Sequence, residues 1–320
     1  MPTMPIIDLL PWWEGTPSGR RHVAGAVDEA LRDVGFLLIA NHRIPPHLTA
    51  AARVAAKSFF ALPPEVKAAY SVDPAVYRGW AGPGSQSNSA SYGIDTPPDL
   101  KETFSVGPFD VPDDEYHRTA GAWFAPNRLP PDRPDITDGL RGWYTALAAL
   151  AYEILQIFAV GLGLHPQALQ RHCERPVSLL SVNWYPPYTA TPPEVGQFRA
   201  GPHTDFGTLT IVDRQPGVAG LQVQDDAGEW RDAPVVPGTL TVNIGDLMAL
   251  WTGGRWRSTR HRVLPPSPDA PNEELVSLIF FHEADYDAVI TPLTNAAGID
   301  AEPVIAGEYL RKKLDKLGLN

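Results

Sequence analysis

Short apolar segments separated by turn residues fill the second half of the chain, from residue 176 to residue 292. Gly196, Pro237-Gly238 and Gly253-Gly254 are among the turn signals, which follow one another at intervals of roughly 8–12 residues. This spacing favours an antiparallel sandwich or barrel over a parallel sheet with crossover helices. We predict strands near residues 178–186, 206–212, 219–224, 239–243, 256–264, 275–282 and 286–290.

Helices dominate the first half. Leu140, Trp143, Leu147 and Leu150 recur at helical spacing and predict a helix from about residue 138 to residue 163. Similar patterns and end signals predict further helices. These cover residues 18–35, 46–62 and 306–317, and short strands are expected over 6–8 and 36–40.

The segment 73–138 is rich in Pro, Gly, Ser and Asp and has little periodicity. A compact domain rarely carries so long a loop without a function, so we expect parts of it to cover a site. No linker separates the helical half from the strands. We therefore expect a single unit over residues 1–320. It consists of a mainly helical region with strands and this long loop (1–175), a β-rich core (176–292) and a C-terminal helix (293–320).

The chain is acidic and has a single cysteine. Its net charge is −11 and no Lys/Arg-rich run is present, so we expect neither a nucleic-acid partner nor an anionic membrane surface as a partner. Cys173 is alone, so no intramolecular disulfide can form. The chain shows no cationic-then-apolar leader and no apolar run of about eighteen residues. We expect a cytoplasmic protein.

A histidine and a carboxylate lie two residues apart at His203 and Asp205, and His261 follows 56 residues later (261 − 205). In a strand, residues i and i+2 point to the same face, so both side chains can reach one ion. Two histidines and one carboxylate on one face of an octahedral metal leave three positions open, which suits ferrous iron that binds a chelating cosubstrate and dioxygen. His-x-Asp alone is a weak signal, and its neighbourhood decides its meaning.

The neighbourhood resembles the isopenicillin N synthase-like family of 2-oxoglutarate/iron(II) dioxygenases. The matching stretches follow one another in family order and cover nearly the whole chain. They are Pro5-Ile6-Ile7-Asp8, Gly35-Phe36, Asn41-His42, Asp99-Leu100-Lys101-Glu102-Thr103-Phe104, Asn183-Trp184-Tyr185-Pro186, His203-Thr204-Asp205-Phe206-Gly207-Thr208-Leu209-Thr210, Gly220-Leu221-Gln222-Val223, Val242-Asn243-Ile244-Gly245-Asp246, Trp251-Thr252-Gly253-Gly254, His261-Arg262-Val263 and Ser277-Leu278-Ile279-Phe280-Phe281.

The resemblance implies a mainly β fold with flanking helices, namely a double-stranded β-helix (jelly-roll, cupin-like) core with an N-terminal helical portion outside it. It implies Fe(II), 2-oxoglutarate and O2 as cofactors, with Asn183, Tyr185 and Ser277 in the cosubstrate pocket. The reaction implied is oxidation of an unactivated C–H bond by hydroxylation, desaturation or cyclisation. We interpret Asn243-Ile244-Gly245-Asp246 as a tight turn, with Gly245 chosen for backbone freedom.

One departure from the family is Leu275, which stands where the arginine of the Arg-x-Ser motif is expected. In typical members that arginine makes a charge-assisted contact with the far carboxylate of 2-oxoglutarate. Three explanations are open: another cation, a different 2-oxo acid with an apolar tail, or a cosubstrate-free oxidase like the family's namesake. The nearest cations in sequence are Arg199, Arg257, Arg260 and Arg262, and strand alternation points the last two away from the metal.

Substrate-binding candidates lie mostly in the irregular N-terminal segment. Tyr77-Arg78-Gly79-Trp80 resembles an Arg-Gly-aromatic stretch that edges the substrate pocket in relatives, so Arg78 either receives a substrate carboxylate or forms a surface ion pair. Further candidates are Tyr92, Lys101, Thr103 and Phe281. The resemblance implies a small amino-acid-like, peptide or specialised-metabolite substrate, for example in antibiotic biosynthesis.

Two readings from other classes compete. A non-catalytic small-molecule-binding protein on the same fold would be expected to lose metal ligands first, whereas all three are present here. A zinc hydrolase would need a general base near the metal, and no Glu stands close to the triad in sequence.

We expect a monomer or weak homodimer.

Overall fold

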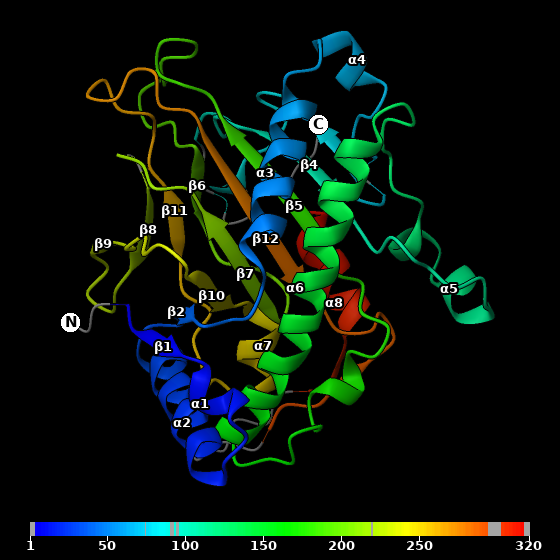
Figure 1. Ribbon diagram of the computed structural model, residues 1–320, viewed down its shortest axis with the longest axis vertical. Coiled ribbons are helices and arrows are strands. Elements are labelled where there is room, and N and C mark those ends of the chain that lie inside the picture. Colours follow the sequence, from blue (N-terminus) through cyan, green and yellow to red (C-terminus); the bar gives the residue numbers. More distant parts are fainter. Residues whose placement is uncertain are drawn as a thin grey trace.

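Two β-sheets face each other, and helices cover the outer face of the larger one (Figure 1). This arrangement comes from a computed structural model that describes residues 4–73, 75–89, 93, 96–218, 220–293 and 302–316. It is the double-stranded β-helix core with flanking helices that the sequence predicts.

The large sheet has eight strands, paired antiparallel except for the parallel pair β1 and β2. In spatial order they are β1 (Ile6–Asp8), β2 (Phe36–Ala40), β10 (Leu240–Ile244), β7 (Leu209–Arg214), β12 (Leu275–His282), β5 (Leu179–Tyr185), β4 (Glu102–Val106) and β3 (Gly79–Ala81). The small sheet contains β6 (Ala200–His203), β11 (His261–Val263), β8 (Leu221–Gln224) and β9 (Trp230–Asp232), and β13 (Val289–Ile290) pairs with β14 (Val304–Ile305).

The longest helix is α6 (Pro134–Gly161), which packs beside α2 (Pro17–Asp33) and α3 (Pro46–Phe60) on the large sheet. By length and composition α6 also resembles a membrane span, and half of its most apolar window is buried inside the fold. The other described helices are α1 (Leu10–Trp13), α4 (Pro64–Ala68), α5 (Glu115–Ala120), α7 (Asp246–Trp251), α8 (Ala306–Leu314) and the 3-10 helices Gly121–Phe124 and Gln170–His172.

The two faces of the large sheet differ in chemistry because side chains alternate along each strand. On β12, Val276, Leu278 and Phe280 point into the hydrophobic core beneath the helices. Ser277 and Ile279 point the other way and line a cavity between the two sheets. Each fully buried aliphatic or aromatic side chain on the core face contributes about 1.5–3 kcal/mol of hydrophobic stabilisation. The helices therefore hold one face of the sheet closed, which leaves the other for a site.

Several boundaries differ from the sequence predictions. The segment 73–138 is not only a covering loop, because β3 and β4 lie within it and extend the large sheet. All five residues of β4 are buried, so their run lacks the alternation that marks a half-exposed strand. The strand predicted over 256–264 shortens to β11. The α2 helix is capped by Thr16, whose Oγ1 accepts from Gly19 N at 3.1 Å.

A charged cluster fastens the N-terminal helices to the segment that follows α7. Arg255 donates two hydrogen bonds to the Asp28 carboxylate, at 2.8 and 2.7 Å, and Trp256 Nε1 donates a third at 2.9 Å. Burial alone raises the pKa of Asp28, but these bonds and the charges of Arg255 and Arg32 hold it below its ordinary value of 3.8. The carboxylate joins residues more than two hundred positions apart in the chain.

We expect Asp28→Ala to lower the free energy of unfolding by about 2–3 kcal/mol, because buried Trp256 loses its acceptor along with the charged pair. Since the folded-state pKa is depressed, this stabilisation is present above pH 3.8 and is lost as the pH falls through the lower folded-state pKa. Urea denaturation over a pH series measures it. The matched variant Asp33→Ala removes an exposed pair on the same helix and is expected to cost below about 0.5 kcal/mol. Equal losses in the two variants would contradict this role for Asp28.

Candidate metal centre

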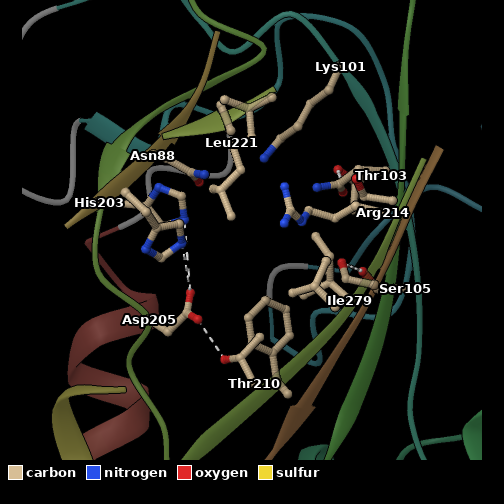
Figure 2. A pocket seen from close by; sticks show the side chains of 18 of the residues that line it. Asn88, Lys101, Thr103, Ser105, His203, Asp205, Thr210, Arg214, Leu221 and Ile279 are labelled. Atoms are coloured by element: carbon tan, nitrogen blue, oxygen red, sulfur yellow. Dashed lines mark hydrogen bonds and ion pairs between the residues drawn. The ribbon is translucent and has the colours of Figure 1, made fainter. Parts of the chain in front are cut away.

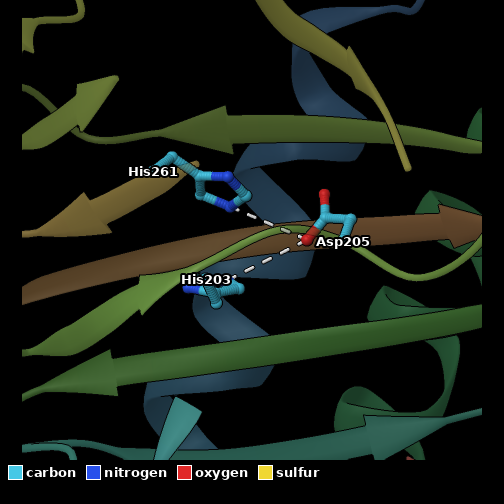
Figure 3. A group of neighbouring side chains, drawn as sticks. All are labelled: His203, Asp205 and His261. Atoms are coloured by element: carbon cyan, nitrogen blue, oxygen red, sulfur yellow. Dashed lines mark ion pairs between the residues drawn. The ribbon is translucent and has the colours of Figure 1, made fainter. Parts of the chain in front are cut away.

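The three ligands predicted from the sequence meet at one point (Figure 3). Their nearest donor atoms all lie within 4.8 Å of one another. Asp205 Oδ1 is 3.6 Å from His261 Nε2 and 3.9 Å from His203 Nε2. Two atoms that each lie about 2 Å from one ion are at most about 4 Å apart, so the carboxylate can share an ion with either histidine.

The small sheet brings the two histidines together. His203 ends β6, His261 begins β11, and the two are direct register partners. Asp205 lies beyond the end of β6, in the connection to β7, so strand alternation is not what aligns it with His203. The turn after β6 achieves the same convergence, which corrects the geometric reason given from the sequence.

Backbone carbonyls fix the orientation of both imidazole rings. His203 Nδ1 lies 2.7 Å from the carbonyl oxygen of Gly201, and His261 Nδ1 lies 3.1 Å from that of Thr259. A neutral imidazole that donates through Nδ1 keeps the lone pair of Nε2 for a metal. Both Nε2 atoms face Asp205, so the rings are oriented for metal binding.

Two side chains of the large sheet hold the Asp205 carboxylate. Thr210 Oγ1 and Asn243 Nδ2 each donate to Oδ2 at 2.6 Å, which leaves Oδ1 turned toward the histidines. Asn243 therefore lies in strand β10 and positions a ligand, and its assignment to a tight turn is wrong. Gly245 has φ −99°, so backbone freedom does not explain it either. A Cβ there would lie 2.5 Å from the Gly207 carbonyl oxygen, so close approach of two backbones requires the glycine.

The electrostatics of the triad suit a cation. Burial alone raises the pKa of Asp205, but His261, His203 and the hydrogen bonds from Thr210 and Asn243 outweigh burial and lower it. Burial and the nearby His261 lower the pKa of His203. A carboxylate and a neutral imidazole are the protonation states in which these side chains bind a divalent metal. Two nitrogens and one oxygen on one side of the ion fit ferrous iron.

A cavity of about 700 Å³ opens beside the triad, with the large sheet as its opposite wall (Figure 2). Asn183, Tyr185 and Ser277 all line it. Thr103 Oγ1 donates to Asn183 Oδ1 at 2.9 Å, and Asn183 Nδ2 donates to the Tyr185 hydroxyl at 3.3 Å. Thr103, predicted as a substrate residue, therefore supports the predicted cosubstrate wall.

The other predicted substrate residues are divided. Lys101 lines the cavity near Tyr185, with its ammonium 3.3 Å from the buried carboxylate of Asp99. Phe281 lines the cavity beside Thr210, its register partner. Tyr77 and Arg78 lie at the end that α8 closes. Tyr92 lies outside the described residues.

None of the four arginines proposed as a replacement cation is among the described residues that line the cavity. They lie elsewhere; for example, Arg199 pairs with Glu273 at 3.2 Å, and Arg262 bonds Gln222 and stacks on Trp230. A cation that the sequence reasoning missed, Arg214, extends into the cavity from the side opposite His203 and Asp205 (Figure 2). The strand predicted from the sequence ended at residue 212. Had it been extended by two residues, alternation would have placed Arg214 on the same face of the strand as Thr210.

Glu283 is a second missed residue. It is buried and lines the cavity, as does Phe281 two residues before it. Burial raises the pKa of its carboxyl to about 8. A Cβ on Gly207 would lie 1.8 Å from Glu283 Oε2, so the glycine makes room for this acid. The sequence signal was weak because Glu283 follows the predicted end of the strand.

Two family models match the chain. The one described as "non-haem dioxygenase in morphine synthesis N-terminal" matches residues 4–132, and the one described as "2OG-Fe(II) oxygenase superfamily" matches residues 176–284. The validamycin A dioxygenase of Streptomyces hygroscopicus subsp. limoneus is 40% identical over 319 residues, which cover 97% of this chain and 86% of the relative. The chain belongs to the 2OG-Fe(II) oxygenase superfamily. It is a 2-oxoglutarate/iron(II)-dependent dioxygenase, as the resemblance implied.

Other relatives support the assignment of this dioxygenase to the superfamily. The 2-oxoglutarate-dependent dioxygenase caaD of Aspergillus niger is 33% identical, over 97% of this chain and 92% of the relative. A full-length Neurospora crassa protein solved in complex with alpha-KG superposes with a TM-score of 0.84 at 26% identity, over 98% of this chain and 96% of that one. The same protein was also solved with alpha-KG and thymine.

We expect Asn243→Ala to weaken metal binding about 10- to 100-fold, because Asp205 loses the amide that orients it. Anaerobic titration with Fe(II), or with Mn(II) as a stable substitute, measures the affinity. Asn127→Ala is the control, since the Asn127 amide bonds the backbone of Gly107. If both variants bind metal as tightly as the wild type, Asn243 does not position the ligand.

Proposed function

We propose that the dioxygenase oxidises an unactivated C–H bond of a small, polar specialised metabolite that binds in the cavity beside the metal ligands. The observation that carries this proposal is the cavity itself, which adjoins His203, Asp205 and His261 and has charged side chains at both ends. With iron(II) and 2-oxoglutarate bound, dioxygen would be the oxidant, and decarboxylation of 2-oxoglutarate would supply two of the four electrons that reduce it. The protein would hold the metal on one side and orient both organic molecules.

Different parts of the cavity would bind the metal, the cosubstrate and the substrate. His203, Asp205 and His261 would hold the iron on the wall formed by the small sheet. The wall formed by Asn183, Tyr185 and Ser277 would take the cosubstrate, and the hydrogen bond from Thr103 would fix the Asn183 amide. The substrate would then bind at the end of the cavity away from the cosubstrate wall, which α8 closes.

Two ionisable groups at the α8 end, Arg78 and Glu283, indicate a polar substrate. Arg78 is buried, with one hydrogen bond to the Trp123 carbonyl and no hydrogen-bond partner for Nη1 among the described residues. Burial raises the pKa of the Glu283 carboxyl to about 8, so it is mostly protonated at neutral pH and can hydrogen-bond a ligand hydroxyl, and it ionises above pH 8, where it can pair with a cationic group. Apolar side chains surround them, namely Tyr77, Trp123, Val177, Phe206, Leu310 and Leu314. An unpaired buried polar group is costly, so a ligand with matching groups is favoured here.

The relatives support this substrate class. The 40% identical relative is named validamycin A dioxygenase, and the alignment spans nearly the whole chain. We therefore infer a metabolite of the size and polarity used in antibiotic biosynthesis, in preference to a peptide. Small molecules of other kinds are compatible with the fold, since the Neurospora crassa protein binds thymine.

We expect the Fe(II)-loaded dioxygenase to release succinate from 2-oxoglutarate when validamycin A or a similar polar metabolite is added, and to give a product of altered mass. Nuclear magnetic resonance measures succinate, and mass spectrometry distinguishes added oxygen from loss of two hydrogens. His203→Ala, which removes a metal ligand, should abolish both signals. Substrate-dependent oxygen consumption without release of succinate would contradict the proposal and identify a cosubstrate-free oxidase.

We expect Glu283→Gln to raise the KM for a substrate with a cationic group by about 10-fold or more above pH 8, where the carboxyl is ionised, because a hydrogen bond to a charged group contributes about 1.5–3 kcal/mol. A neutral substrate analogue should be affected much less, and the glutamine keeps the shape that Gly207 accommodates. Steady-state kinetics with the two substrates measures the difference. Equal changes for both would show that Glu283 only supports the fold.

A further inference from the structure

Leu275 leaves one end of the cosubstrate wall without the cation found in the family motif. It lines the cavity next to Tyr185, its direct register partner on β5. The second carboxylate of 2-oxoglutarate would be buried there, and an unpaired buried carboxylate costs several kcal/mol. Some other side chain of this chain has to supply a positive charge.

Three Lys or Arg side chains line the cavity within the described part of the chain, and only one fits. Arg78 lies at the α8 end, where its guanidinium packs against Gly107. Lys101 already faces the buried carboxylate of Asp99 at 3.3 Å. Arg214 lies on the cosubstrate side and has no carboxylate partner among the described residues.

The sheet register places Arg214 beside the cosubstrate wall. Thr103, Asn183, Ser277 and Arg214 are successive partners across β4, β5, β12 and β7. All four line the cavity. Because Arg214 lies opposite Ser277, it is the diagonal neighbour of position 275 on the adjacent strand. Such neighbours have Cβ atoms about 7–8 Å apart, so long side chains from either position reach the same space.

Neutral acceptors hold the Arg214 guanidinium in place. Nε donates to Thr241 Oγ1 at 3.0 Å, Nη1 to the Ala233 carbonyl at 3.2 Å and Nη2 to the Pro234 carbonyl at 2.7 Å. A guanidinium has five N–H groups, so these three bonds leave two (5 − 3) for an anion. Burial lowers the pKa of Arg214 to about 10, and it therefore still carries its charge at neutral pH. A fixed, charged and uncompensated guanidinium is prepared to bind a carboxylate.

We propose that Arg214 binds the far carboxylate of 2-oxoglutarate, together with Ser277 and Tyr185, in place of the arginine that Leu275 replaces. The proposal rests on the use of 2-oxoglutarate by this dioxygenase. Relative to the family motif, the guanidinium comes from the neighbouring strand β7 and not from β12. Leu275 occupies the position at which the family has its arginine. Arg214 thereby also selects a dicarboxylic 2-oxo acid over one with an apolar tail.

The test is an anaerobic titration of the Fe(II)-loaded protein, following the metal-to-ligand charge-transfer band. Arg214→Leu should raise the Kd for 2-oxoglutarate at least about 30-fold, since two charged hydrogen bonds are lost, and should leave Fe(II) binding unchanged. The Kd for 2-oxopentanoate, which has the same chelating end and no second carboxylate, should not rise. Arg214→Gln keeps donors for the neighbouring carbonyls and removes the charge, so it tests the same point if Arg214→Leu fails to fold.

Two further variants locate the charge. Arg262→Leu removes an arginine that stacks on Trp230 outside the cavity, and it should bind 2-oxoglutarate like the wild type. The double variant Arg214→Leu with Leu275→Arg returns a guanidinium to the family position and should recover at least part of the lost affinity. Tight 2-oxoglutarate binding by both Arg214 variants, with loss of binding in Lys101→Met, would overturn the proposal in favour of Lys101.

Failure of cosubstrate use gives a different result. If the wild-type protein binds Fe(II) but gives no band at millimolar 2-oxoglutarate or 2-oxopentanoate, then the 2-oxo acid reaction is wrong for this chain, and the Arg214 assignment is overturned with it. If the wild type gives the band and the Arg214 variants give it with an unchanged Kd, only the Arg214 assignment is wrong.

Discussion

The hydrogen bonds from Thr210 and Asn243 to Asp205 connect the metal centre to the rest of the molecule. The two histidines belong to the small sheet, whereas Thr210 and Asn243 project from the large one. Asp205 lies in the connection between β6 and β7, so without these bonds its carboxylate would be free to turn away from the histidines. The large sheet thus sets the position of the third ligand, and its own position is set by the helices packed on its outer face.

The same sheet gives the cavity its polarity. Its inward-facing side chains change along the strands from Arg214, Ser277 and Asn183 at one end to Thr210, Phe281 and Glu283 at the other. A dicarboxylate is suited to the first end and a polar substrate to the second, with the metal ligands between them on the facing wall. Under the proposed assignments, two different molecules would bind at one metal without competing for the same charged groups.

The helices and the strand-rich second half were predictable from local pattern, whereas the β-helix topology and the role of His203, Asp205 and His261 were implied by the family resemblance. Strand spacing after residue 176, the helical period around Trp143 and the pair His203 and Asp205 are each visible in a short window. The buried strand β4 was not visible, because a strand covered on both faces loses its alternation. The end of β7 was set two residues short, and this concealed Arg214.

The sequence by itself determined that the chain forms a β-helix core with covering helices and that two histidines and an aspartate are available for iron. Only the tertiary structure decided which polar side chains hold those ligands and which line the cavity beside them. Asn243, Arg214 and Glu283 lie on different strands or beyond their ends, and sheet register alone brings them to one cavity. Register is a long-range property, since a shift of one residue turns every side chain of a strand to the other face.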